Sequence, residues 1–193
     1  MTASAQLSTA NLGHPTGTRS GAGTMAKRVG GVLLAGLFLG SAVAMPAHAD
    51  GGLLAWPKDV VYVVDQTNSK WPVERAAENL DDKSPLNLVR VKKCPSGSAQ
   101  CITVRTKKIS GATAGTTVYS YRNHVDLVSA SIYLDSNEEG ASYHNRLAMA
   151  THELGHAVGM GHQGISSVMN PYVSSKTRST PSSADYARLN KAY

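Results

Sequence analysis

Three histidines, at positions 152, 156 and 162, constrain this 193-residue chain more than any other feature of its sequence. His152 and His156 are four residues apart, so on a helix they project from one face, about one turn apart. Two imidazoles at this spacing can bind one Zn²⁺, and Glu153 beside them can act on a water held by the metal. The alternative is a polar helix face with two ordinary histidines.

The residues after the helix favour a metal site. A continuing helix would place His162 on a different face, six residues beyond His156. Gly159 allows the chain to leave the helix, because glycine adopts the left-handed conformation that ends helices without a Cβ penalty. A turn at this point can bring His162 back to the same ion. Three neutral imidazoles leave a fourth position open for water, which is typical of a catalytic zinc.

The first 49 residues differ from the rest of the chain. Residues 1–24 are polar and show no apolar periodicity. Lys27 and Arg28 then precede an apolar run over residues 29–45, which is followed by the small-x-small sequence Ala47-His48-Ala49. A basic region, an apolar region and such a cleavage site together predict a secretory signal peptide.

We therefore predict a signal peptide over residues 25–49, and a secreted, extracellular protein. Met25 lies where such a peptide should begin, so residues 1–24 are interpreted as an upstream extension from a start codon placed too early. A membrane anchor is the alternative, because the run over residues 29–45 is at the short edge of what spans a bilayer. Its glycines, and the absence of a basic cluster after it, favour the cleaved signal.

Cleavage after Ala49 leaves one predicted domain over residues 50–193, which is long enough for a single packed core. Loss of Arg19, Lys27 and Arg28 lowers the formal net charge from +6 to +3. A charge of +3 spread along the chain is no footprint for nucleic acid. We expect no nucleic-acid partner, no membrane contact after signal cleavage, and a monomer.

The mature chain contains two cysteines, Cys94 and Cys101. In an exported protein, a pair this close favours a disulfide, and two free buried thiols are the alternative. The runs over residues 86–93 and 102–109 on either side have strand character. With the turn between them, they predict a β-hairpin.

Periodicity gives the order of the remaining elements. Val73, Ala76, Ala77 and Leu80 share one helical face, and Ser69 is the expected cap of that helix, with Pro72 near its first turn. The order of strands and helices predicts an α+β domain with one mixed sheet packed on two helices. We expect further strands over residues 60–64, 118–121 and 128–134, and further helices over residues 143–160 and from a cap at Ser183 to Tyr193.

Two segments of the chain, residues 152–162 and 167–172, resemble a known family. Residues 152–162 match the HExxHxxGxxH signature of the metzincins in full. Residues 167–172, Ser-Val-Met-Asn-Pro-Tyr, resemble that family's tight turn with a methionine under the metal. The resemblance implies that Met169 forms a soft apolar floor and does not ligate; ordinary core packing is the alternative.

Among the metzincins, the chain is most similar to the matrixins and their small bacterial relatives. The Met-x-Pro order ending at Pro171 is matrixin-like, as is a closing helix with Asp185, Leu189 and Tyr193. The resemblance implies a zincin fold, with a mixed, mostly parallel five-stranded sheet on two helices and a C-terminal helix after the Met-turn. It also implies that Pro171 and Tyr172 shape the substrate pocket, although Tyr172 follows the proline one residue earlier than in the family.

Two further departures concern metals and latency. The acidic run that binds structural calcium in matrixins is short here, which leaves calcium open. Its counterparts are Asp135, Asn137, Glu138 and Glu139. The propeptide cysteine that keeps matrixins latent has no counterpart, because both cysteines of this chain lie within the predicted domain.

The residues and the resemblance together predict a secreted zinc-dependent endopeptidase with Glu153 as general base and a protein or peptide as substrate. The substrate would lie extended along an edge strand over residues 118–123. The alternative is a catalytically silent, secreted zinc-binding recognition module. The presence of Glu153 and the lack of a fourth protein ligand favour the enzyme. A zinc peptidase acting on a non-protein amide is also left open.

Overall fold

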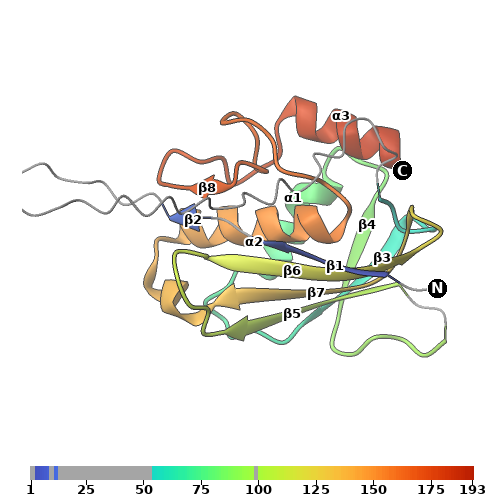
Figure 1. Ribbon diagram of the computed structural model, residues 1–193, viewed down its shortest axis with the longest axis horizontal. Helices are drawn as coiled ribbons and strands as arrows, with labels where there is room; N and C mark the ends of the chain where they lie inside the picture. The colour runs from blue at the N-terminus through green and yellow to red at the C-terminus, as the bar shows by residue number, and fades with distance from the viewer. Residues whose placement is uncertain (1–2, 9–10, 13–53, 98–99) are drawn as a thin grey trace, which may run out of the picture. The chain divides into compact units, whose positions relative to one another are not determined.

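A computed structural model describes residues 3–8, 11–12, 54–97 and 100–193, all within one compact unit of the chain (Figure 1). The predicted signal peptide, residues 25–49, lies outside the described residues. Among the residues that the structure does describe, no helix is long and apolar enough to cross a membrane.

The central element is a mixed sheet, which confirms the predicted fold class. Its strands follow the order β6-β7-β5-β3-β4. The β3–β4, β3–β5 and β5–β7 pairs are parallel, and only β6 and β7 run antiparallel. The strands are β3 (Val60–Asp65), β4 (Asn87–Val91), β5 (Cys101–Lys107), β6 (Gly115–Arg122) and β7 (Asp126–Asp135).

Two short strands come from the N-terminal extension, where the sequence analysis predicts no structure. The strand β1 (Ala3–Ser8) lies along β6 and adds an antiparallel sixth strand at that edge of the sheet (Figure 1). The strand β2 (Asn11–Leu12) pairs in parallel with β8 (Tyr172–Val173).

The predicted hairpin between β4 and β5 is wrong. Both strands pair in parallel with β3, which lies between them. The burial of Val61, Val63 and Val64 explains why β3 lies in the interior of the sheet, because a central strand of a parallel sheet is covered on both faces. The disulfide between Cys94 and Cys101 is confirmed, with Cα atoms 6.1 Å apart. It closes the loop that connects β4 to β5, although the two strands do not pair with each other.

Helices α1 (Val73–Asp81) and α2 (Tyr143–Ala157) lie side by side on the same face of the sheet (Figure 1). The predicted apolar face of α1 is confirmed as its buried face. Pro72 occupies the N-cap position of this helix, so Ser69 is not its cap. A proline is favoured at a helix start because its missing N–H has no partner to lose there.

The C-terminal helix α3 (Ser183–Ala192) is confirmed, with its start shifted by one residue. Ser182 rather than Ser183 caps it, and forms a capping box with Asp185. A 3₁₀ turn (Ser136–Gly140) joins β7 to α2. The Tyr193 hydroxyl donates to the carbonyl of Val158 at 3.1 Å, which ties α3 to the end of α2.

Candidate active site and metal centre

Helix α2 carries two of the three histidines into the interior. The helix is buried all round from Leu147 to Ala157, because the sheet covers one side and the segment after Gly161 covers the other. The Nδ1 of His152 lies 2.9 Å from the Val168 carbonyl oxygen. The Nδ1 of His156 lies 2.8 Å from the carbonyl oxygen of Met160. A carbonyl only accepts, so each Nδ1 carries the proton and each Nε2 keeps its lone pair.

The three Nε2 atoms converge. That of His156 lies 3.0 Å from that of His152 and 3.2 Å from that of His162. Two nitrogens bound at 2.0–2.1 Å in a tetrahedral zinc site lie roughly 3.3–3.4 Å apart, so the spacing fits one ion. Among the described residues, these three histidines are the only group of His, Cys, Asp or Glu placed to hold a metal. The structure therefore brings the predicted triad together.

Burial keeps the imidazoles in the form that binds metals. It lowers the pKa of His152 to about 4, mainly because the charged form loses its hydration. The same cause lowers the pKa of His156 well below its usual value, and lowers that of His162 as well. Neutral imidazoles are the ligands that zinc requires, so the site is prepared for a cation at neutral pH.

Gly159 makes the turn that returns His162 to the site. Its φ is 90°, the left-handed conformation that the sequence predicts. Its N–H donates to the His156 carbonyl at 3.0 Å, as in a helix C-cap. A second constraint escapes sequence reasoning: a Cβ at this position would overlap the carbonyl oxygen of Leu54. Two independent constraints therefore require glycine at position 159: its left-handed backbone conformation and the close approach of the Leu54 carbonyl.

Met169 lies beneath α2, fully buried. Its sulfur is so close to Gly155 that a Cβ there would overlap it. The Met169 carbonyl accepts the N–H of Gln163 at 2.9 Å, which ties this turn to the residue after His162. The position is compatible with an apolar floor under the histidines, and the missing side chain of Gly155 is what allows the close contact.

Asp185 supports the same turn from α3. Its fully buried carboxylate accepts the Ser167 hydroxyl at 2.6 Å and the Val168 N–H at 3.2 Å. The Val168 carbonyl in turn faces Nδ1 of His152 at 2.9 Å. The sequence indicates Asp185 only by its spacing in the last helix, whereas the structure shows that it holds the peptide unit that orients a histidine.

Glu153 points toward β6, where its carboxylate is fully buried. Its Oε2 accepts the Thr117 hydroxyl at 2.6 Å, and its Oε1 has no hydrogen-bond partner among the described residues. Burial raises the pKa of Glu153 to about 8, and the hydrogen bond from Thr117 partly opposes that rise. A Cβ at Gly115 would lie 2.7 Å from Oε1, so only glycine leaves room for this carboxylate.

Sequence reasoning misses Gly115 and Thr117 as site residues. They lie 36 and more residues before Glu153, ahead of the predicted strand over residues 118–121, and only the fold brings β6 beside α2. The predicted pocket residues are less well defined. Pro171 is partly buried, and Tyr172 leaves 59% of its surface exposed in β8.

Within the described residues, the carboxylates of the acidic run do not gather into a second cluster of ligands. Asp135 accepts the N–H groups of Ile109 and Asn137 at 3.0 and 3.1 Å, and Glu139 pairs with Lys70 at 3.0 Å. Calcium therefore stays as open as the sequence leaves it, and within the described ranges only the histidines form a ligand cluster.

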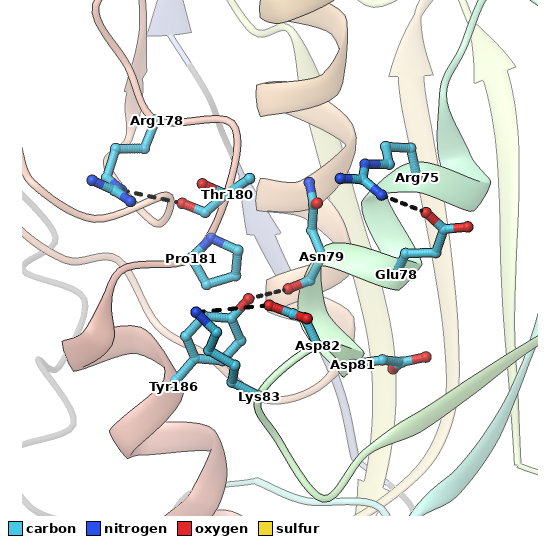
Figure 2. Close-up of a pocket in the computed structure, with 10 residues that line it drawn as sticks. All are labelled: Arg75, Glu78, Asn79, Asp81, Asp82, Lys83, Arg178, Thr180, Pro181 and Tyr186. Carbon is cyan, nitrogen blue, oxygen red and sulfur yellow. Dashed lines mark hydrogen bonds and ion pairs between the residues drawn. The ribbon is translucent and has the colours of Figure 1, made fainter.

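A surface hollow of about 540 Å³ lies away from the histidines, between α1 and the segment before α3 (Figure 2). Its charged side chains largely neutralise one another, as in the Arg75–Glu78 pair at 2.8 Å. It is lined by Arg75, Glu78, Asn79, Asp81, Asp82, Lys83, Arg178, Thr180, Pro181 and Tyr186. It contains no residue of the metal centre.

A sheet on two helices, with three histidines converging beside a buried glutamate, defines a zincin-type metalloprotease architecture. The family model of the matrixins (peptidase M10) matches residues 42–193, and the chain therefore belongs to the matrixin family. No curated protein sequence matches it. Two solved structures of myroilysin are similar, with TM-scores of 0.48 and 0.47 and identities of 14% and 16%. These matches cover 75% and 74% of this chain and 92% and 98% of the myroilysin chains.

Proposed function

We propose that this chain is a secreted zinc-dependent endopeptidase in which Glu153 is the general base. The observation that carries the proposal is the convergence of three histidine ligand atoms, two of them on the helix that also carries the buried carboxylate of Glu153. Membership of a metalloprotease family supports the same reaction class. The disulfide fits an oxidising, extracellular environment.

The catalytic roles divide between the histidines and the glutamate. His152, His156 and His162 would hold zinc, which when bound polarises the scissile carbonyl and lowers the pKa of its water to about 7. Glu153 would act as general base, taking a proton from the attacking water and passing it to the leaving amine. Burial raises the pKa of Glu153 to about 8 against the opposing hydrogen bond from Thr117, and a dication bound nearby would lower it again, which favours a base that works near neutral pH.

The substrate is proposed to be an extended peptide. Where β1 is displaced, the sheet ends at β6, whose main-chain groups would then accept an added strand, and Gly115 and Thr117 of β6 lie against Glu153. On the other side, Pro171 and Tyr172 follow directly after the Met169 turn. A peptide held between the two would cross the histidine site, with Pro171 and Tyr172 shaping the pocket for one of its side chains.

The test is Glu153→Gln in secreted protein, assayed on a peptide library with and without a chelator. A general base contributes about 10²–10⁴-fold, so turnover should fall by that factor while bound zinc stays at one per chain. Glu78→Gln, the same change at an exposed glutamate on α1 away from the histidines, is the matched control. A variant with more than about a tenth of wild-type turnover would contradict the base assignment. Zinc-loaded wild type without any turnover would support the silent recognition module instead.

A further inference from the structure

The connection between β7 and α2 contains the acidic run in which the matrixin resemblance places a structural calcium (Figure 1). Calcium takes about six to eight oxygen ligands, which come from carboxylates, backbone carbonyls and water. Such a site needs several oxygens that are free to turn toward the ion, and it needs no fixed positive charge among them. The contacts of this connection meet neither condition.

The carboxylate of Asp135, at the end of β7, is engaged by donors of the protein itself. Its Oδ1 accepts the N–H groups of Ile109 and Asn137 at 3.0 and 3.1 Å, and its Oδ2 accepts the side-chain amide of Asn137 at 3.2 Å. The residue leaves only 3% of its surface exposed. The carboxylate thus ties the loop before β6 to the 3₁₀ turn through N–H groups alone.

Glu139, at the other end of the 3₁₀ turn, is engaged in a similar way. Its Oε1 accepts the side-chain amide of Asn68 at 2.6 Å, and its Oε2 accepts the ammonium group of Lys70 at 3.0 Å. Lys70 and, to a smaller extent, Asn68 lower the pKa of Glu139 by hydrogen bonding to its charged form. Both oxygens of this carboxylate therefore face nitrogen donors from the segment that precedes α1.

Arg146 brings a second fixed cation to the connection, from the beginning of α2. Its Nε donates to the carbonyl oxygen of Lys70 at 2.8 Å, and its Nη1 donates to those of Glu139, at 3.3 Å, and Ala141. Backbone carbonyl oxygens gathered from separate segments are ligands that calcium also takes. Here they surround a guanidinium, which is always charged and presents several N–H donors in one plane.

The charges of this connection also disfavour a bound dication. A guanidinium and an ammonium a few ångströms away would repel it, and this repulsion is strongest where water is partly excluded. Within the described residues, only the three histidines gather as His, Cys, Asp or Glu ligands for a metal. The donor set of the β7–α2 connection therefore does not fit calcium, although its sequence is acidic.

We propose that Arg146 and Lys70 take the place of a structural calcium, so that the domain holds the start of its histidine-bearing helix without that ion. The two cations join three parts of the fold: the segment before α1, the 3₁₀ turn and α2 itself. Arg146 lies on the same helix as His152, six residues before it. A domain built in this way keeps its histidine site in surroundings that are free of calcium.

The first test asks whether calcium binds to the full 193-residue chain, prepared with its disulfide in the Glu153→Gln background so that self-cleavage is excluded. After dialysis against calcium-free buffer, metal analysis should find less than about a tenth of a calcium per chain, because even a sensor-grade site would retain more. Adding about 10 mM CaCl₂ in place of MgCl₂ should change Tm by less than about 1 °C, whereas a site with a Kd of up to about 1 mM would raise it by roughly 3–6 °C. One retained calcium per chain, or a rise of that size with CaCl₂ alone, would overturn the inference.

The second test removes the cation from α2. Arg146→Gln keeps a polar side chain without the charge and should lower Tm by roughly 5–10 °C, because charged hydrogen bonds to three carbonyl groups are lost. Arg75→Gln, which breaks an exposed pair with Glu78 on α1, is the matched control and should change Tm by less than about 2 °C.

Equal melting temperatures for Arg146→Gln and Arg75→Gln would show that Arg146 does not carry the proposed role. The calcium measurement on the parent chain decides the question even if Arg146→Gln does not fold. Both tests read metal content and melting temperature rather than turnover, so their outcome is separate from that of the proposed peptidase function.

Discussion

Replacing Thr117 by valine tests whether the hydroxyl on β6 positions the Glu153 carboxylate. Valine has nearly the same shape as threonine, so the packing between β6 and α2 is retained and only the hydroxyl is lost. Thr117 is fully buried, and its hydroxyl lies 2.6 Å from Oε2 and 3.0 Å from the carbonyl oxygen of Glu153. The substitution therefore removes the one side-chain donor to this carboxylate among the described residues.

The expected size of the effect follows from the kind of bond removed. A hydrogen bond to a charged group contributes about 1.5–3 kcal/mol. If that energy holds Glu153 where it reaches the attacking water, its loss lowers kcat by roughly 10- to 150-fold, at about 1.4 kcal/mol per tenfold. The free energy of unfolding should also fall by about 1–3 kcal/mol, because Oε2 is left buried without a partner.

The assay measures kcat and KM separately, together with zinc per chain. We expect lower kcat, nearly unchanged KM and full zinc in Thr117→Val, because the histidines are untouched. Thr117→Ser keeps the hydroxyl and should retain kcat within several-fold of wild type. Wild-type kcat in Thr117→Val would refute the positioning role, and zinc loss in parallel with kcat would show a structural effect instead.

Three further changes test the metal site and the electrostatics of the fold. His162→Ala should leave well below one zinc per chain after dialysis, and full occupancy by metal analysis would mean that the third ligand lies elsewhere. Gly159→Val should lose zinc almost as fully, because its φ of 90° and the Leu54 carbonyl both exclude a side chain. Burial raises the pKa of Asp81 to about 6 from its usual 3.8, so this carboxyl stabilises the fold when protonated. Relative to Asp81→Asn, wild type should be most stable below about pH 4 and lose that advantage as the pH rises through 6, as followed by urea unfolding.

The histidine triad could be predicted because its information is local. Helical periodicity predicts that His152 and His156 share one face, and Gly159 predicts the turn that returns His162, all within the same eleven residues. The structure brings these three side chains together, with one ligand atom from each within 4.8 Å of the others.

The missed features depend on pairing between distant segments. Alternating residues in β4 and β5 predict two strands but do not say whether they pair with each other or with a third strand. Here β3 separates them, and the α1 crossover between β3 and β4 is what makes their pairing parallel. Thr117 and Gly115 were missed for the same reason, because a threonine and a glycine in a strand show nothing of the carboxylate that will lie against them.

The N-terminal strands β1 and β2 illustrate a different limit. Residues 3–12 have neither the alternation nor the β-branched content that predicts a strand. Their pairing comes from the open edge of β6, which is a property of the partner. Strand addition of this kind can be expected only after the receiving sheet has been assembled.

The hydrogen bonds of Asp185 imply that the histidine site is completed only after the C-terminal helix has formed. Translation proceeds from the N-terminus, so all three histidines emerge before the residue that holds the Val168 peptide unit against His152. A chain that has emerged only as far as Tyr172 carries every metal ligand, yet lacks the carboxylate that fixes the Met169 turn. Full assembly of the histidine site must therefore wait until α3 has docked, and a metalloprotease built in this way is incomplete while its own chain is still being synthesised.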